Sequence, residues 1–93
     1  MNTFTSESGI HRTAPQQVKV DKVIDARGIY CPGPLVELIR VMRLSSPGTI
    51  FEVLSSDRIS TKDIPDWVNR CGHEYIGIRE KADSWSLYIR KNK

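Results

Sequence analysis

Cys31 lies in the segment GIYCPGPLVELI, residues 28–39, between a leading glycine and two prolines. Gly28 can adopt backbone angles that other residues avoid, and Pro32 and Pro34 each fix one backbone dihedral. A thiol in so restricted a segment favours chemistry at the sulfur, as a nucleophile or as a carrier of a transferable group. The alternative is an inert core cysteine, because free cysteines are often buried. Composition and spacing alone leave both interpretations open.

The residues after Cys31 predict a helix that begins at Pro32, a residue type tolerated at the first helical position. Its apolar face consists of Leu35, Leu38, Ile39 and Met42, at the spacing i, i+3, i+4, i+7. A helix N-terminus carries partial positive charge and unpaired N–H groups. We therefore predict a moderate lowering of the Cys31 pKa and a site that favours a thiolate or a persulfide anion. The lowering is moderate because Pro32 and Pro34 lack an N–H, whereas Gly33 keeps one.

The neighbourhood of Cys31 in the sequence lacks the partners of a complete redox or hydrolytic site. Position 34, where a Cys-x-x-C motif has its second thiol, is proline, and no histidine is close by. A lone activated thiol suits the passing of a group between proteins. The second cysteine, Cys71, continues an apolar stripe with Ile64, Trp67 and Val68 and is predicted to be core. The alternative for Cys71 is a disulfide with Cys31.

Size and composition predict one small domain, residues 18–93, after a flexible polar tail, residues 1–17. The chain has 93 residues, of which 39% are hydrophobic and 27% charged. No apolar run approaches the roughly 20 residues of a membrane span, and the N-terminus lacks the pattern of a signal peptide. We therefore expect a cytoplasmic protein. Two cysteines and two histidines without paired spacing predict no metal, and no other cofactor is expected.

The periodicity along the chain predicts the order β-α-β-α-β-β. The expected strands are residues 18–25, 49–56, 74–80 and 84–91; the helices start at Pro32 and near Ser60. Ser60 and Asp63 have the spacing of a capping box, Pro65 belongs to the first turn, and Gly72 ends the helix. The apolar strand 49–56 is expected inside the sheet. The predicted fold is α/β (α+β), a two-layer sandwich with both helices on one face of a mixed four-stranded sheet.

The net charge of +3 would favour contact with acidic partners or RNA, but solubility is the usual explanation of such a surplus. If the loops converge around the thiol, a basic rim for docking partner proteins is expected there, comprising Arg27, Tyr30, Arg43, Arg58 and Lys62. Scattered solubilising charge is the alternative. His73, which follows Gly72, is expected to cap or pack rather than to catalyse.

Two segments resemble the signatures of the TusA/SirA-like sulfur-carrier family. DARGIYCPGP, residues 25–34, has the family's Asp, a glycine three positions later, and Cys-Pro-x-Pro; the x residue is Gly33 here. SSDRISTKDIPDWVNRCGHE, residues 55–74, is similar to the family's second segment, in which an acidic loop leads into T-x-D-I-P. The resemblance covers about residues 20–91, and both segments occur in the expected order.

The resemblance implies a sulfur carrier rather than a complete enzyme. Cys31 would accept sulfane sulfur as a persulfide from a cysteine desulfurase or rhodanese-like donor and pass it to an acceptor protein. The family serves tRNA thiolation, molybdenum-cofactor assembly and dissimilatory sulfur metabolism. Asp25, Gly28, Pro32, Gly33 and Pro34 would support the motif, with Asp25 equally explained as a loop cap. We expect a monomer that binds neither membrane nor nucleic acid directly.

Two other functions remain as hypotheses. One is a small basic module that binds RNA or a regulatory protein, with Cys31 incidental. Against it, Trp85 and Tyr88 are predicted on opposite faces of their strand, which does not suit base stacking. The other is a thiol redox enzyme, which would require a functional disulfide between Cys31 and Cys71.

Overall fold

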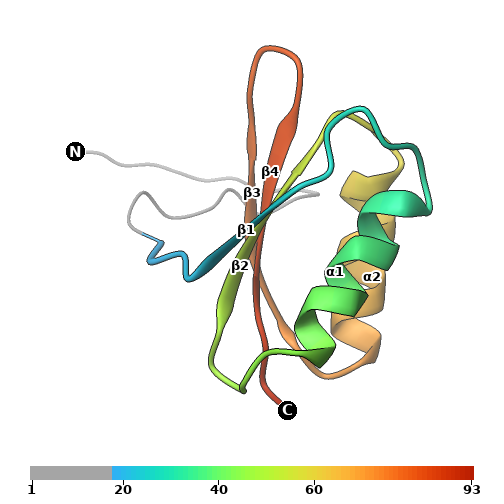
Figure 1. The fold of residues 1–93 in the computed structure, drawn as a ribbon. Helices are drawn as coiled ribbons and strands as arrows, with labels where there is room; N and C mark the ends of the chain where they lie inside the picture. Colours follow the sequence, from blue (N-terminus) through green and yellow to red (C-terminus); the bar gives the residue numbers. More distant parts are fainter. Residues whose placement is uncertain (1–17) are drawn as a thin grey trace.

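A four-stranded sheet packs against two helices in the computed structural model of the chain, which describes residues 18–93 (Figure 1). In chain order the elements are β1 (Lys22–Asp25), α1 (Gly33–Arg43), β2 (Ile50–Ser55), α2 (Ser60–Arg70), β3 (Glu74–Glu80) and β4 (Trp85–Arg90). The predicted order β-α-β-α-β-β is confirmed. The predicted tail, residues 1–17, lies outside the described residues.

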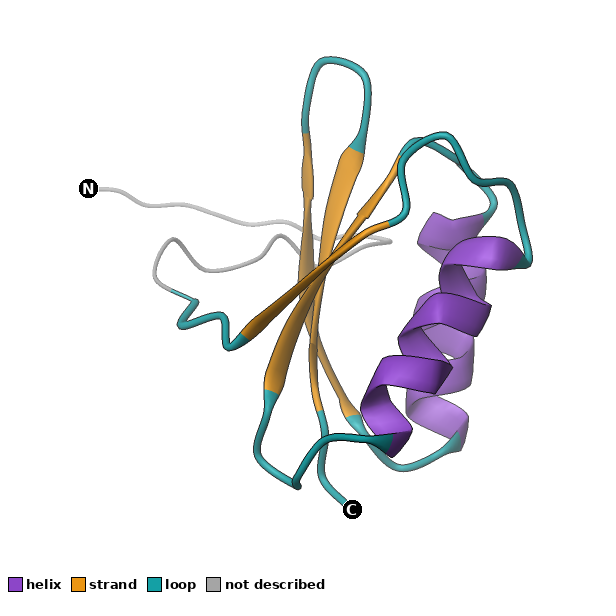
Figure 2. Cartoon of the chain, viewed as in Figure 1, coloured by secondary structure: helices purple, strands orange, loops and turns teal. Residues whose placement is uncertain are grey.

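The strands lie in the order β1-β2-β4-β3. β1 and β2 run parallel, whereas β4 is antiparallel to both of its neighbours, so the sheet is mixed as predicted. β2 is interior, which its apolar sequence indicated. α1 and α2 cover the same face of the sheet (Figure 2). This arrangement is the predicted two-layer α+β sandwich.

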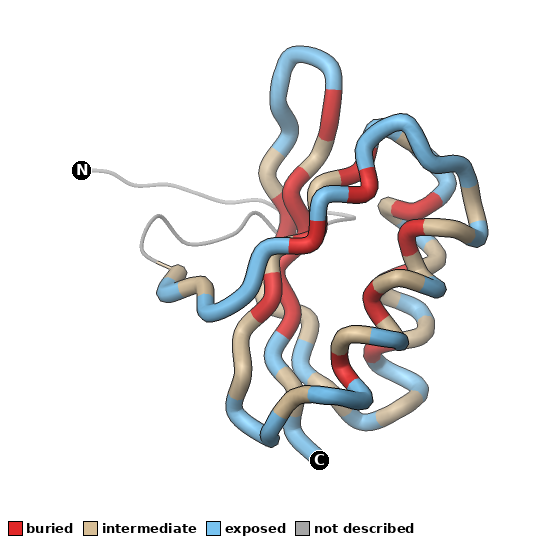
Figure 3. Tube along the Cα trace, viewed as in Figure 1, coloured by how far each residue is buried: buried red, intermediate tan, exposed pale blue. Residues whose placement is uncertain are grey.

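The core lies between the sheet and the helices, where the buried segments of both layers face each other (Figure 3). Its fully buried side chains alternate along the strands and recur along the helices; they include Phe51, Val53, Leu87, Ile89, Leu38, Ile64 and Val68. The strand register also separates two aromatic residues. Trp85 pairs with Ser55 on the helix side, whereas Tyr88 pairs with Glu52 on the other side. The two rings therefore lie on opposite faces, as predicted.

The start of α2 differs from the prediction. Ser60 is the first helical residue rather than the cap, and no capping box with Asp63 forms. Instead, Asp57 accepts the Ile59 N–H through Oδ1, and its carbonyl accepts the Ser60 N–H. Because the helix begins this early, Pro65 falls in the second turn, not the first. An aspartate before the helix thus takes the role that the sequence pattern assigned to Ser60.

Two other elements start later in the sequence than predicted. β1 begins at Lys22, not at Val18. α1 begins at Gly33, with Pro32 as its N-cap residue. The α1 shift of one residue is within the usual variation of helix ends, whereas β1 starts about four residues later than predicted.

The parallel pairing of β1 with β2 positions the functional residues. The carboxyl ends of parallel strands meet at one edge of a sheet, and the connections that follow them start there. The loop from β1 to α1 and the loop from β2 to α2 therefore lie together, at the top right of Figure 1. Within residues 18–93, neither helix has the length and apolar character that crossing a membrane requires.

Candidate functional site

A direct hydrogen bond joins the two loops at the carboxyl edge of β1 and β2. The Gly28 N–H donates to Ser56 Oγ at 2.8 Å. Gly28 has φ +83°, an angle that residues with a side chain rarely adopt. The loop then turns so that the Ile29 N–H reaches Ala26 O at 3.2 Å. Glycine at position 28 is therefore required by the turn that carries the chain to Cys31.

Cys31 lies at the junction of the two loops, partly exposed. Its backbone N–H donates to the carboxylate of Asp57, which belongs to the loop before α2. Its Sγ lies 2.9 Å from Asp63 Oδ2, in the first turn of α2. Thus one carboxylate holds the main chain of Cys31 and a second contacts the sulfur. Both carboxylates come from the second segment of the sequence, not from the cysteine motif.

The pKa of the Cys31 thiol is raised, to about 11, so the predicted lowering is wrong. The main cause is the hydrogen bond from the thiol to Asp63; partial burial and the negative charges of Asp63 and Asp57 act in the same direction. The helix N–H groups do not offset this effect. The Gly33 N–H is bonded to Tyr30 O at 2.7 Å in the turn around Cys31.

The Cys-Pro-Gly-Pro residues fix the start of α1 in different ways. Pro34 is fully buried in the first turn, which agrees with its predicted place, and Pro32 is exposed. The peptide bond between Cys31 and Pro32 is cis. Gly33 lies so close to the Ile29 side chain that a Cβ atom there would overlap with it. The glycine at the variable motif position is thus matched to Ile29.

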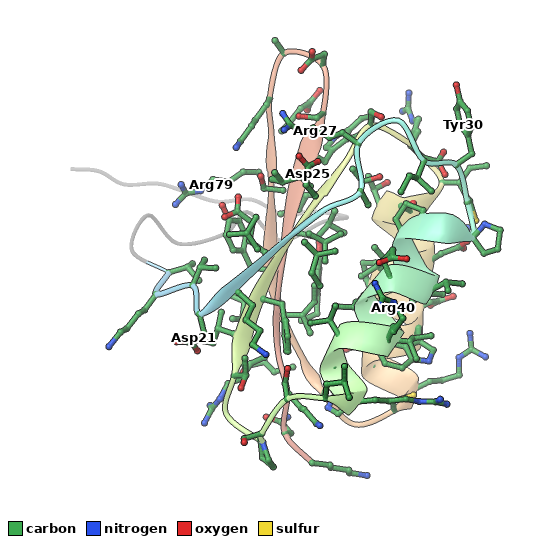
Figure 4. All side chains as sticks on the ribbon, viewed as in Figure 1. Asp21, Asp25, Arg27, Tyr30, Arg40 and Arg79 are labelled. Carbon is green, nitrogen blue, oxygen red and sulfur yellow. The ribbon has the colours of Figure 1, made fainter. Side chains whose placement is uncertain are left out.

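Asp25 and Arg27 form a closed pair at the end of β1 (Figure 4). The Arg27 guanidinium donates to both carboxylate oxygens of Asp25, at 2.9 and 2.7 Å, and the Arg27 N–H also donates to it. These bonds lower the pKa of Asp25 to about 2. Asp25 therefore accepts hydrogen bonds from the loop that follows β1, as the loop-cap interpretation expects.

The residues predicted to form a basic rim have different surroundings in the structure. Arg27 is occupied by Asp25. Arg43 is the last residue of α1, about 15 Å along the helix from Gly33. Arg58 and Lys62 remain exposed at the start of α2. Tyr30 is 80% exposed and projects beyond the starts of the helices (Figure 4).

Exposed apolar side chains occur in the segments that lead to Cys31 and to α2. They come from the motif loop, the first turns of α1 and the residue before α2, and comprise Ile29, Tyr30, Val36 and Ile59. We call these four residues the apolar rim. Sequence reasoning missed three of them. The available signal was that Val36 and Ile59 are apolar residues outside the periodic stripes of their helices.

Cys71 and His73 lie at the other end of α2. Cys71 follows Asp63 by eight positions, about 12 Å along a helix, and both cysteines are free. Cys71 is partly exposed rather than fully buried. His73 Nδ1 accepts the Asn92 N–H at 3.1 Å, and its ring centroid is 5.8 Å from that of Trp67. The packing role predicted for His73 is confirmed. Within residues 18–93, no three His, Cys, Asp or Glu side chains cluster as a metal site would require.

Comparison with known proteins gives the family. The sequence model of a family described as Sulfurtransferase TusA matches residues 22–91. The chain belongs to the TusA family. Its TusA-like segment includes Cys31, Asp57 and Asp63, so the whole site lies inside the matched region.

Relatives from distant organisms share this segment. A candidate sulfur carrier protein of Archaeoglobus fulgidus is 48% identical over 71 residues, which cover 76% of this chain and 97% of the relative. Sulfur carrier protein TusA of Pseudomonas fluorescens is 33% identical over 84% of this chain and 94% of its own length. The crystal structure of a SirA-like protein from Desulfitobacterium hafniense superposes with a TM-score of 0.70 at 23% identity, covering 78% of this chain and all of that one. That structure supports the TusA-family fold.

Proposed function

We propose that this protein is a sulfur carrier that holds sulfane sulfur on Cys31 as a persulfide. The observation that supports it most is the position of Cys31: a partly exposed thiol in the TusA-family motif, where the two loops at the carboxyl edge of β1 and β2 meet. The neighbouring loops and helix starts also carry exposed apolar residues, a feature that favours contact with another protein.

The transfer requires no oxidant or reductant beyond the donor. The Cys31 sulfur attacks the outer sulfur of a donor persulfide, R–S–SH, and forms a new S–S bond. The bond between the two donor sulfurs breaks, and its electron pair leaves with the inner sulfur. That leaving thiolate takes up the proton that Cys31 released, so Cys31–SH and R–S–SH become Cys31–S–SH and R–SH. Delivery repeats the same exchange with an acceptor thiol.

The partners are a sulfur donor and a sulfur acceptor, as the TusA family implies. A cysteine desulfurase or a rhodanese-like protein is the donor class that supplies a protein-bound persulfide. The apolar rim would provide the contact surface for these partners, and Tyr30, 80% exposed, is its aromatic residue. The position of the rim suits successive rather than simultaneous docking, because both partners need the same sulfur.

Mass spectrometry after incubation with polysulfide tests the proposal. We expect a gain of one sulfur atom on the peptide that contains Cys31. The Cys31→Ser variant should not gain it, and the Cys71→Ser variant, as the matched thiol control, should gain it as the unmodified protein does. Sulfur found mainly on Cys71, or equally on both thiols, would contradict a dedicated carrier site.

A further inference from the structure

Asp63 contacts the sulfur from outside the cysteine motif. Its Oδ2 lies 2.9 Å from Cys31 Sγ, although 32 positions separate the two residues in the sequence. Asp63 lies in the first turn of α2, where the helix dipole stabilises a negative charge. The field of this helix end therefore acts on the aspartate next to the sulfur.

The hydrogen bond defines which state of the thiol the site stabilises. A carboxylate only accepts hydrogen bonds, so the thiol is the donor and must carry its proton. Ionisation of Cys31 would place two negative charges at the same contact, which disfavours the thiolate. Asp57 adds a second negative charge close by, through its contact with the Cys31 main chain.

The neighbouring cations do not offset these carboxylates. Arg58 and Lys62 are exposed, and neither forms an ion pair with Asp57 or Asp63 within residues 18–93. Arg27, the nearest cation of the motif loop in sequence, is bonded to Asp25. The sulfur is therefore held among acidic groups, opposite to the basic surrounding that the sequence predicted.

We propose that Asp63 is a positioning residue that keeps the proton on Cys31 in the free carrier, so that the thiol is a weak nucleophile until a docked partner neutralises or displaces the Asp63 carboxylate. The biological purpose of this protonation rests on the proposed carrier function, whereas the effect of Asp63 on the thiol does not depend on that function. A cationic side chain is the partner group that fits, because it would pair with Asp63 and lower the cost of ionising the thiol. A free carrier would then be protected from small electrophiles.

Alkylation of Cys31 by iodoacetamide, followed by peptide mass spectrometry as a function of pH, tests the proposal. Asp63→Asn keeps the shape of the side chain and removes its charge, which should return the thiol pKa from about 11 toward its ordinary value near 9. At pH 8 the thiolate fraction then rises by about two orders of magnitude, and its lower basicity reduces its nucleophilicity by about one. We expect alkylation to be about tenfold faster at pH 8, with the midpoint of the profile more than one pH unit lower.

Two variants separate the charge effect from a structural one. Asp66→Asn removes an exposed carboxylate from the same helix and should leave the Cys31 profile unchanged. Asp63→Glu restores a carboxylate and should move the profile back toward that of the unmodified protein. An unchanged or slower rate for Asp63→Asn overturns the proposal, and a slower rate would make Asp63 a general base instead.

The unmodified protein provides a test that does not depend on the folding of any variant. Its Cys31 alkylation midpoint should lie above pH 9, and a midpoint below pH 9 overturns the proposal. Because iodoacetamide needs no sulfur chemistry, the outcome is independent of persulfide formation. If Asp63→Asn speeds alkylation while no variant gains sulfur from polysulfide, the role of Asp63 stands and the carrier function fails.

Discussion

Gly28 donates its backbone N–H to Ser56 Oγ at 2.8 Å, and this bond joins the loops that follow the two parallel strands. The next residue after Ser56 is Asp57, whose carboxylate accepts the Cys31 N–H, so this bond lies directly beside the contact that holds the main chain of Cys31. The relationship therefore connects a glycine of the cysteine motif with the carboxylates that surround the sulfur.

Gly28→Ala should destabilise the protein by about 1–2 kcal/mol, because position 28 has a positive φ. The loss should come from backbone strain alone, since an added Cβ meets no other atom. Gly48→Ala is the matched control: Gly48 also has a positive φ, 94°, and open space, but lies in the connection from α1 to β2 at the other end of the fold. Urea unfolding should show similar losses for both variants. Only Gly28→Ala should also speed Cys31 alkylation, by loosening the loop. Equal alkylation rates in the two variants would contradict this junction.

Asp57→Asn should destabilise the protein by about 1–3 kcal/mol, since the carboxylate holds the N–H groups of both Cys31 and Ile59. Amide hydrogen exchange should become faster at Cys31, which loses a charged acceptor. Asp83→Asn, an exposed change in the turn between β3 and β4, is the control and should alter neither measurement. Unchanged exchange at Cys31 in Asp57→Asn would mean that the contact is not maintained in solution.

The fit of Ile29 against Gly33 predicts coupling between the two positions. Alanine at a helix's first turn is favoured over glycine, by up to about 1 kcal/mol, but a Cβ at Gly33 overlaps with the Ile29 side chain. Gly33→Ala should therefore be neutral or destabilising in the unmodified protein and stabilising in an Ile29→Ala background. A double-mutant cycle of unfolding free energies should give a coupling of at least about 0.5 kcal/mol. Additive free energies would show that Ile29 moves aside without cost.

The surroundings of His73 lead us to expect a lower free energy of unfolding in mild acid. Burial lowers the pKa of His73 below its usual value, and the charges of Lys91 and Lys93 lower it further. The unfolded chain then binds a proton more readily than the folded one. Stability from neutral His73 is present above about pH 6.5 and is lost as the pH falls below it. Protonation also removes the Nδ1 acceptor that the Asn92 N–H uses.

The comparison of the unmodified protein with His73→Gln measures this effect. The unfolding free energy of the unmodified protein should fall more steeply between pH 7.5 and 5.5 in urea titrations, since glutamine does not titrate; the pH limits are about one unit either side of the ordinary histidine pKa. Parallel slopes for the two proteins would assign the acid sensitivity to other groups.

Local patterns were sufficient to predict the element order, the interior place of β2 and the helix that follows Cys31. Each depends on periodicity or on proline chemistry within a few residues. The electrostatics of the thiol could not be predicted in this way. Asp63 contacts Cys31 across 32 positions, through the parallel pairing of β1 with β2. The spacing of Ser60 and Asp63 indicated a helix cap, and only the tertiary structure turns Asp63 toward the sulfur.

Cys31 lies beside the first turn of α2 and Cys71 follows its last residue. This separation bears on how long a sulfur atom stays bound to Cys31. An internal thiol that reached a persulfide could attack its inner sulfur, expel hydrosulfide and close a disulfide ring. Ring closure needs Cα atoms within about 7 Å, whereas roughly 12 Å of helix lies between Asp63, which touches Cys31, and Cys71. Cys71 is therefore poorly placed to close this ring, which favours release of the sulfur to a thiol that a second molecule brings.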